Sequence, residues 1–231
     1  MKLDSRQTIH IGINLVSAPA PVLDRPSARR FQEYLEDADI AFTNTEYKDR
    51  LLLVRDPIKP LQINVGVVGP QVGQLVIVAG MPDRSIADFC EEAEKVLVAY
   101  ERAWPAQARQ LVHVDATIRD LYETSTDHAF KELWETRLHQ RPDSLQALGP
   151  GLAGGGLRFV IPPADADHLT PLMEVKIESF LQNSHKLFIE TQFLYTQPAP
   201  LGAPTEITQR LNALNDYARQ DVVSFIQEGQ Q

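Results

Sequence analysis

The sequence predicts an α+β protein in which long helices cover one face of an antiparallel sheet. Segments with alternating apolar residues, the pattern of half-buried strands, recur along the chain. Two long amphipathic helices are indicated at about residues 85–104 and 204–228. The elements also occur twice in one order: strand, helix, several strands, long helix. We therefore expect two similar halves, 1–106 and 107–231, as separate units or as one continuous domain.

The first half opens with a strand whose apolar residues share one face: Ile9, Ile11, Ile13 and Leu15. A proline-rich stretch at residues 18–26 ends it, and a short helix follows. The apolar side of that helix carries Ala28, Phe31 and Leu35. Segments rich in β-branched residues then predict four strands, at about 39–47, 50–56, 61–68 and 73–80.

The helix at 85–104 closes the first half. Ser85 and Asp88 have the spacing of a capping box, with Asp in place of the usual Glu, and Pro105 ends the helical pattern. Cys90 lies on the apolar stripe of this helix. We therefore expect a buried structural thiol at Cys90 rather than a nucleophile.

The second half repeats this order. Its opening strand alternates Val112, Val114, Ala116 and Ile118 with polar residues. A helix is predicted at about 126–139, and strands at about 157–162, 171–181 and 186–196. The closing helix carries one apolar stripe: Ile207, Leu211, Leu214, Ala218, Val222 and Phe225. We expect this stripe to pack on a sheet face formed by Met173, Val175, Ile177, Ile189 and Phe193.

This order of elements is similar to that of the TATA-binding-protein fold, in which two strand–helix–strands–helix units share one curved sheet, and to a helix-grip arrangement. The resemblance implies an architecture only, because one fold hosts many functions.

Composition restricts the function classes. The formal net charge of −9 makes nucleic-acid binding unlikely, since phosphate backbones are held mainly by clustered Lys and Arg. Apolar runs such as 51–54 are far shorter than the roughly 20 residues of a membrane span. One cysteine permits no internal disulfide, and the first residues lack the apolar core of a signal peptide. We expect a soluble, cytoplasmic protein without membrane contact.

Two loop motifs are candidates for a bound group. Gly149-Pro-Gly-Leu-Ala-Gly154 has the spacing of a dinucleotide-binding turn, but it precedes a strand instead of linking a strand to a helix, which favours a flexible loop. Asp165, Asp167 and His168 could offer metal ligands from one loop. They follow two prolines in a polar turn, where such residues are common without a metal. We predict no cofactor.

His10 and His113 occupy matching places in the two opening strands, on the face opposite the apolar residues. If the halves are related by symmetry, the two imidazoles could approach one another near its axis. The simpler interpretation is two half-exposed strand histidines.

A charged hairpin is predicted in the second half. Glu174, Lys176 and Glu178 alternate with apolar residues, and Glu190 lies on the return strand. A turn centred on Asn183 would place Lys176 opposite Glu190. The face is either a solvated sheet surface with cross-strand pairs or a polar binding surface, which Phe180 and Phe188 would border.

The sequence does not determine the function. We favour a non-catalytic binding or assembly protein that uses an uncovered sheet face for a protein partner, a second copy or a ligand. The alternative is an enzyme for a small substrate, with His10, His113 or the 165–168 loop as acid–base or metal groups. Nucleic-acid binding would require a basic stripe along one face.

Overall fold

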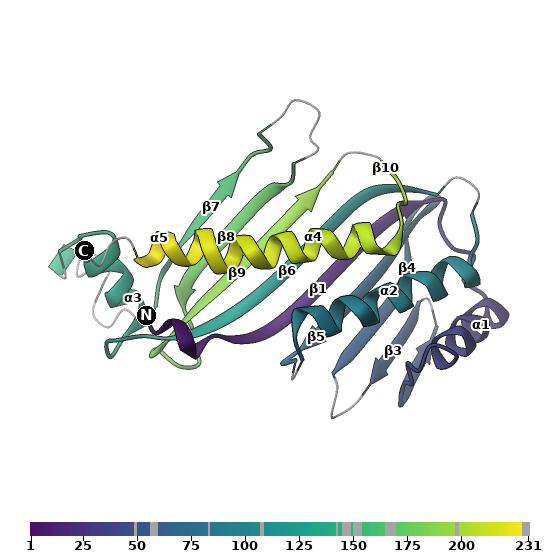
Figure 1. Ribbon diagram of the computed structural model, residues 1–231, viewed down its shortest axis with the longest axis horizontal. Coiled ribbons are helices and arrows are strands. Elements are labelled where there is room, and N and C mark those ends of the chain that lie inside the picture. The colour runs from purple at the N-terminus through teal and green to yellow at the C-terminus, as the bar shows by residue number, and fades with distance from the viewer. Residues whose placement is uncertain are drawn as a thin grey trace.

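The computed structural model describes residues 1–48, 50–55, 60–82, 84–106, 109–141, 143–144, 149, 154–164, 170–196 and 199–227. Nine antiparallel strands form one sheet in the order β2-β3-β4-β5-β1-β6-β9-β8-β7, and a short tenth strand pairs with β6 (Figure 1). The strands are β1 (Gln7–Ala18), β2 (Asn44–Tyr47), β3 (Leu51–Arg55), β4 (Leu61–Gly69), β5 (Val72–Gly80), β6 (Gln110–Glu123), β7 (Gly156–Ile161), β8 (Leu172–Ser179), β9 (Lys186–Tyr195) and β10 (Ala199–Pro200). The α+β class with an antiparallel sheet is therefore confirmed.

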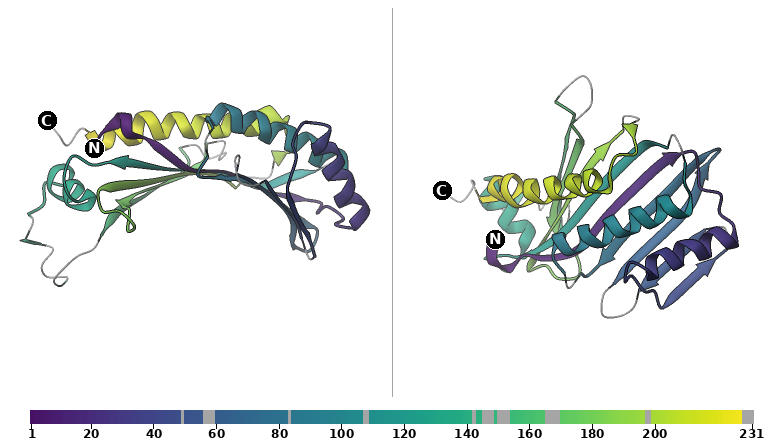
Figure 2. Two further views of the ribbon diagram at one scale, coloured as in Figure 1. Left: turned by 90° about the horizontal axis from the view of Figure 1, so that it is seen from below. Right: turned by 45° about the vertical axis from the view of Figure 1, so that its right-hand side comes forward.

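The helices gather on one side of this sheet. They are α1 (Arg25–Glu36), α2 (Ile86–Ala103), α3 (Ala129–Glu132), α4 (Pro204–Tyr217) and α5 (Val223–Gln227). Figure 2 shows α2 and α4 lying side by side over the convex face of the curved sheet. The concave face carries none of the described helices. None of these helices is both long and apolar enough to cross a membrane.

The two opening strands, β1 and β6, pair with each other at the centre of the sheet. Within residues 1–106, β1 also pairs with the last strand, β5. Within residues 107–231, β6 also pairs with the last of the long strands, β9. Because strand side chains alternate between faces, Ile13 and its partner Ala116 both point toward the helices and are buried.

The helix α2 follows the sequence pattern closely. Both hydrogen bonds of the expected capping box form, from the Asp88 amide to Ser85 Oγ and from the Ser85 amide to Asp88 Oδ2. Its last turn is held by aromatic packing: the Tyr100 and Trp104 rings lie 5.3 Å apart, and both contact Phe31 of α1. Cys90 is buried on this helix, as predicted.

The closing helix is also present, with one departure from a regular α-helix. A π-turn at Ala218–Val222 joins α4 to α5. The extra residue in this turn rotates the end of the helix, so that Val223 and Ile226 are buried and Phe225 is only partly buried. Phe225 still packs against the core cluster that contains Val222, so the expected apolar stripe continues to Phe225, and Val223 and Ile226 extend it. Leu211 and Leu214 pack in one cluster with Phe193 and Met173, as predicted. The other three residues of the predicted face, Val175, Ile177 and Ile189, lie in a second cluster, with Val222 at the end of the helix.

The predicted helix at 126–139 is much shorter than expected. Only Ala129–Glu132 is α-helical, and a second π-turn follows at Leu133–Arg137. His128 caps α3 through its ring nitrogen, which accepts a hydrogen bond from the Phe130 amide. The first strand after α1 is also shorter than predicted, since it begins only at Asn44.

Candidate functional site

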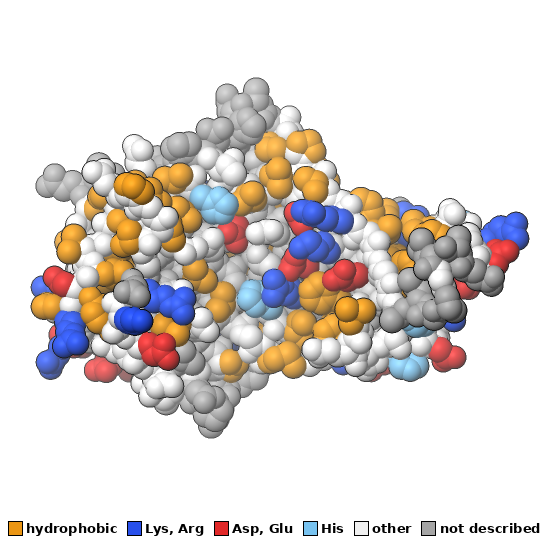
Figure 3. Space-filling view, turned by 180° about the vertical axis from the view of Figure 1, so that it is seen from behind, with side chains coloured by type: hydrophobic (Ala, Val, Ile, Leu, Met, Phe, Trp, Pro, Cys, Tyr) orange, Lys and Arg blue, Asp and Glu red, His pale blue; other side chains and the backbone are white. Residues whose placement is uncertain are grey.

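The concave sheet face, opposite the helices, is called the open face here. Figure 3 shows this side: charged and histidine side chains gather over the middle of the sheet, between apolar patches. The open face receives the alternate residues of each strand that do not enter the core, including His10, Asn14, Asp115 and Arg119 on the central pair.

One row of side chains crosses five strands on this face. His10 of β1 lies opposite Arg119 of β6, and Arg119 lies opposite Glu190 of β9. Glu190 lies opposite Lys176 of β8, which lies opposite Arg158 of β7. The sequence predicted six residues for a possible binding face: His10, His113, Glu174, Lys176, Glu178 and Glu190. Four of them are neighbours here, namely His10, Glu190, Lys176 and, beside Lys176, Glu174. Together with Arg119 and Arg158, these residues are called the charged row.

Ion pairs link the charged row from Arg119 to Arg158. Glu190 accepts from Arg119 Nε through Oε2 at 2.5 Å and from Lys176 Nζ through Oε1 at 2.5 Å. Lys176 Nζ also lies 3.2 Å from Glu174 Oε1. Glu174 in turn accepts two hydrogen bonds from Arg158, at 3.0 and 2.8 Å. Two carboxylates therefore lie between three cations.

Burial differs along the charged row. Glu190 is 8% exposed, whereas the side chains of Arg119 and Arg158 are 42% and 64% exposed. Burial by itself would raise the pKa of Glu190, but the hydrogen bonds and charges of Lys176 and Arg119 outweigh it and hold that pKa below its usual value. The carboxylates are thus fixed in place, and the guanidinium groups remain available to solvent.

His10 lies at the inner end of the charged row. Burial lowers the pKa of its imidazole, the charge of Arg119 lowers it further, and Glu190 partly opposes the shift. A Cβ atom on Gly12 would lie 2.9 Å from His10 Nε2, so the ring lies directly over this glycine. Gly12 and its partner Thr117 thus form the floor of the open face next to the charged row.

A second polar cluster lies further along the same central strands. Asp115 Oδ2 accepts a hydrogen bond from Asn14 Nδ2 at 2.7 Å and lies 3.0 Å from His113 Nε2. Asn14 Oδ1 accepts in turn from Gln74 Nε2 at 2.8 Å. Four side chains from three strands therefore form one hydrogen-bonded chain, in which Asp115 orients the imidazole of His113.

The expectation that His10 and His113 could approach one another is wrong. His10 pairs with Arg119 and His113 pairs with Val16, so the two histidines are separated by six ladder positions (16 − 10). At about 3.3 Å per residue, this is on the order of 20 Å. The strands run antiparallel, so matching places in the two strands fall at opposite ends of the pair.

The remaining predicted residues are placed as follows. Glu178 is exposed on the open face, opposite Phe188, and the Phe180 and Phe188 rings stack 6.5 Å apart at this border. Asp165, Asp167 and His168 lie outside the described residues, as do 150–153 of the glycine motif. Within the described ranges, no group of three or more His, Cys, Asp or Glu could hold a metal ion.

Several site residues were missed from sequence. Arg119 and Asp115 alternate with the core residues of β6, as His113 does, so this alternation was a usable signal. Arg158 and Asn14 carry the same signal on β7 and β1. The residues that these side chains contact depend on which strands are neighbours in the sheet. Several neighbouring strands, such as β1 and β6, are far apart in the sequence, so these contacts could not be predicted.

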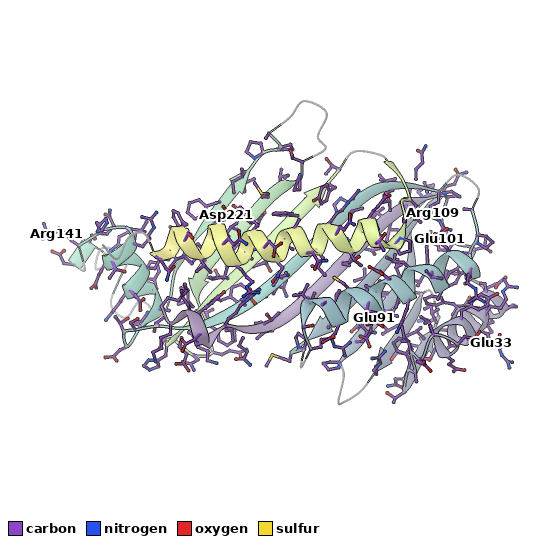
Figure 4. The ribbon with its side chains drawn as sticks, viewed as in Figure 1. Glu33, Glu91, Glu101, Arg109, Arg141 and Asp221 are labelled. Atoms are coloured by element: carbon purple, nitrogen blue, oxygen red, sulfur yellow. The ribbon has the colours of Figure 1, made fainter. Side chains whose placement is uncertain are left out.

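A further charged pair lies on the helix side, away from the open face. Figure 4 shows Glu101 of α2 and Arg109, just before β6, lying close together; they form a salt bridge. Arg109 also donates to the Trp104 carbonyl at 2.6 Å and lies over the Tyr100 ring. Arg109 is buried, and the three residues that it contacts belong to α2 or to its C-cap. These contacts fix the end of α2 against the sheet.

The sequence matches no protein-family model, and no curated protein is significantly similar to it.

Proposed function

We propose that this chain is a non-catalytic binding or assembly protein, and that its open face receives a protein partner or a second copy of the chain. One observation carries the proposal: an interlinked charged row crosses a concave sheet face that none of the described helices covers. One face of an antiparallel sheet is commonly solvated and polar, but an uncovered face that also carries apolar patches is typical of an interaction surface.

The exposure of the charged row supports a partner with acidic groups. Glu190 and Glu174 are already paired, whereas the guanidinium groups of Arg119 and Arg158 are each bonded to one carboxylate and remain substantially exposed. Arginine is enriched at the energetic centres of protein interfaces because its planar fork binds carboxylates bidentately. With a formal net charge of −9, nucleic acid remains the less favoured partner.

Substitution at the floor of the open face tests this proposal. Thr117→Glu places an anion between the charged row and the Asp115 cluster, which repels a partner with acidic groups, and should abolish association without loss of folding. Gln209→Glu on the exposed side of α4 is the control. Sedimentation at several concentrations measures self-association. Photo-crosslinking from Gln192 on the open face, compared with Val98 on α2, measures binding of another protein.

One combination of results would contradict the proposal that the open face binds a partner. If Gln192 and Val98 crosslink the same proteins and Thr117→Glu sediments as the parent does at every concentration, the open face is not the interaction surface.

The enzyme alternative rests on the pair His113 and Asp115. A carboxylate 3.0 Å from an imidazole, itself held by Asn14, is an arrangement that orients a general base. A second imidazole, His10, is on the same face. This function requires turnover of a small molecule that His113→Gln abolishes and that His10→Gln or Thr117→Glu alters. A turnover screen with the three variants separates it from binding alone.

We also infer that the two halves, 1–106 and 107–231, descend from one duplicated unit. The equivalent pairings of β1 with β5 and of β6 with β9 support this, as does the antiparallel β1–β6 pair between them. Superposition of β1, β5 and α2 on β6, β9 and α4 tests it. If the strands superpose in the same direction but α2 does not align with α4, the duplication is contradicted.

A cytoplasmic location is part of the same proposal. Fractionation of the native host would test it.

A further inference from the structure

The edge strand β7 differs from the edge strand at the other end of the sheet. It lies outside β8, and none of the described residues pairs with its outer side (Figure 1). The opposite edge strand, β2, has only 4 residues and exposes polar side chains such as Thr45 and Glu46. Short polar edges of this kind discourage pairing with another chain. β7 is longer, contains no proline and carries one charge, Arg158, so it is less protected.

The helix layer covers β7 incompletely. Leu157, Phe159 and Ile161 lie on the helix side and are only partly buried, whereas Val175, the neighbour of Phe159 on β8, is 3% exposed. Phe159 and Ile161 also line an apolar pocket of about 210 Å³ under the end of the closing helix. Among the described residues, apolar surface of β7 is thus left in the position that a further strand would cover.

The hydrogen bonds of β7 show which backbone groups face outward. The Ser179 amide donates to the Gly155 carbonyl at 3.0 Å, and these two residues continue the register of β8 with β7. Hydrogen-bonded pairs alternate with non-hydrogen-bonded pairs along an antiparallel ladder, so the odd-numbered residues of β7 bond to β8. The amides and carbonyls of Arg158 and Val160 therefore point away from the sheet.

The side chains of β7 favour a second copy of the chain as its partner. In an antiparallel pair, opposite residues share a face, so two copies related by a two-fold axis can pair about one residue. Pairing about Arg158 would place two like charges opposite one another. Pairing about Phe159 places Phe159 opposite itself and Leu157 opposite Ile161, so the contacts on the helix side are apolar. In the same register, the outward backbone groups of Arg158 face those of Val160 in the other copy.

The charge of Arg158 is compatible with this pairing. Its guanidinium donates two hydrogen bonds to Glu174 of β8, at 3.0 and 2.8 Å, and is therefore directed into the charged row of its own chain. We propose that β7 pairs antiparallel with β7 of a second copy, centred on Phe159, so that the two sheets form one continuous sheet. This interface uses the edge of the sheet and does not depend on the function proposed for the open face.

Disulfide crosslinking tests the register. In the proposed pair, the two Phe159 Cα atoms lie about 4.5 Å apart in a non-hydrogen-bonded position, which a disulfide spans. On mild oxidation, Phe159→Cys should form at least about tenfold more covalent dimer than Leu157→Cys. Leu157 is displaced from Leu157 of the other copy by four positions (161 − 157), or about 13 Å. The parent chain, whose Cys90 is buried, gives the background.

Two valines of similar exposure provide a matched control. Val160 on β7 and Val68 on β4 are 53% and 55% exposed. Val160→Lys places a cation opposite Arg158 of the second copy and should abolish the Phe159→Cys crosslink, because like charges lie opposite one another. Val68→Lys makes the same change away from β7 and should leave the crosslink unchanged.

Amide hydrogen exchange of the unmodified protein gives a measurement without substitutions. The amide of Val160 should exchange more slowly at high protein concentration than at low concentration, because dimerisation follows mass action. The amide of Phe159 bonds to β8 within the chain and should be protected at both concentrations. These readouts report on β7 alone, so their failure would leave the proposal for the open face unaffected.

Four outcomes would overturn the proposal. They are absence of the Phe159→Cys crosslink, equal crosslinking of Leu157→Cys, a crosslink that survives Val160→Lys, and exchange at Val160 that is independent of protein concentration. Protection of the Val160 amide only in the presence of another protein would show that β7 pairs with a strand of a different chain, and would also overturn it.

Discussion

Lys176 and Glu190 lie directly opposite one another on β8 and β9, with Lys176 Nζ 2.5 Å from Glu190 Oε1. The second oxygen of the same carboxylate is 2.5 Å from Arg119 Nε on β6. Glu190 is therefore a buried carboxylate between two cations, and it joins three strands of the open face. Removal of its charge should leave those two cations facing each other without a counter-charge.

We predict that Glu190→Gln lowers the free energy of unfolding by about 1.5–3 kcal/mol, the usual contribution of hydrogen bonds to charged groups. Urea denaturation at neutral pH measures it. Arg158→Gln is the control, because its guanidinium is 64% exposed and its ion pair should contribute less than about 1 kcal/mol. An equal loss of unfolding free energy in the two variants would show that the burial of Glu190 does not increase its contribution to stability.

The same carboxylate makes stability depend on pH. The pKa of Glu190 in the folded protein lies below its ordinary value of 4.5, so its pairing stabilises the protein above that value and the stabilisation is lost as pH falls through the lower, folded pKa. Between about pH 6 and pH 3, the unfolding free energy of the parent should fall more steeply than that of Glu190→Gln. Parallel curves for the two proteins would refute the assignment.

The pairing of Lys176 with Glu190 was predictable from sequence, because a short hairpin fixes its own register. Ser85 and Asp88 were likewise local signals and gave the start of α2 correctly. Alternation predicted which face each strand side chain would take.

Non-local pairing was not predictable in the same way. The contact of Asn14 with Asp115 depends on β1 lying beside β6, which periodicity does not specify. The π-turn after Tyr217 was missed because an inserted residue leaves nearly the same apolar spacing as a regular helix.

Leu211 and Leu214 of α4 are fully buried, and each truncation to Ala should cost about 2–5 kcal/mol, since a cavity is left in a packed core. Gln209→Ala, on the exposed side of the helix, should change stability by less than about 0.5 kcal/mol. Denaturation curves of the three variants test this. If both leucine variants also lost less than about 0.5 kcal/mol, α4 would be an exposed arm and not part of the core.

Cys90 should react very slowly with thiol reagents in the native protein. Burial, and then the charge of Glu94, raise the pKa of its thiol to about 11, and its side chain is 6% exposed. At pH 8 the thiolate is then on the order of one part in a thousand. Spectrophotometric labelling with and without urea tests the prediction. Complete labelling of the folded protein within seconds would contradict the prediction.

Gly12 and His10 should be energetically coupled. A methyl group on Gly12 would lie 2.9 Å from His10 Nε2 and 3.1 Å from Val78 Cγ1, so Gly12→Ala must displace the imidazole. We expect a loss of about 1–3 kcal/mol, which is typical of overpacking, and a much smaller loss when His10→Ala is already present. Gly66→Ala is the control on β4, since a Cβ there meets no atom within 4 Å.

Titration of the His10 ring by NMR gives this prediction a second readout. Its pKa in the parent is lowered, first by burial and then by Arg119. Gly12→Ala should push the ring toward solvent, so that its pKa rises toward the ordinary value of 6.5. A lowered folded pKa stabilises the protein above the ordinary value, and this stabilisation is lost as pH falls through the folded pKa, so the variant should also lose less stability on acidification. An unchanged His10 pKa in Gly12→Ala, together with additive losses in the double variant, would show that the imidazole does not lie over Gly12 in solution.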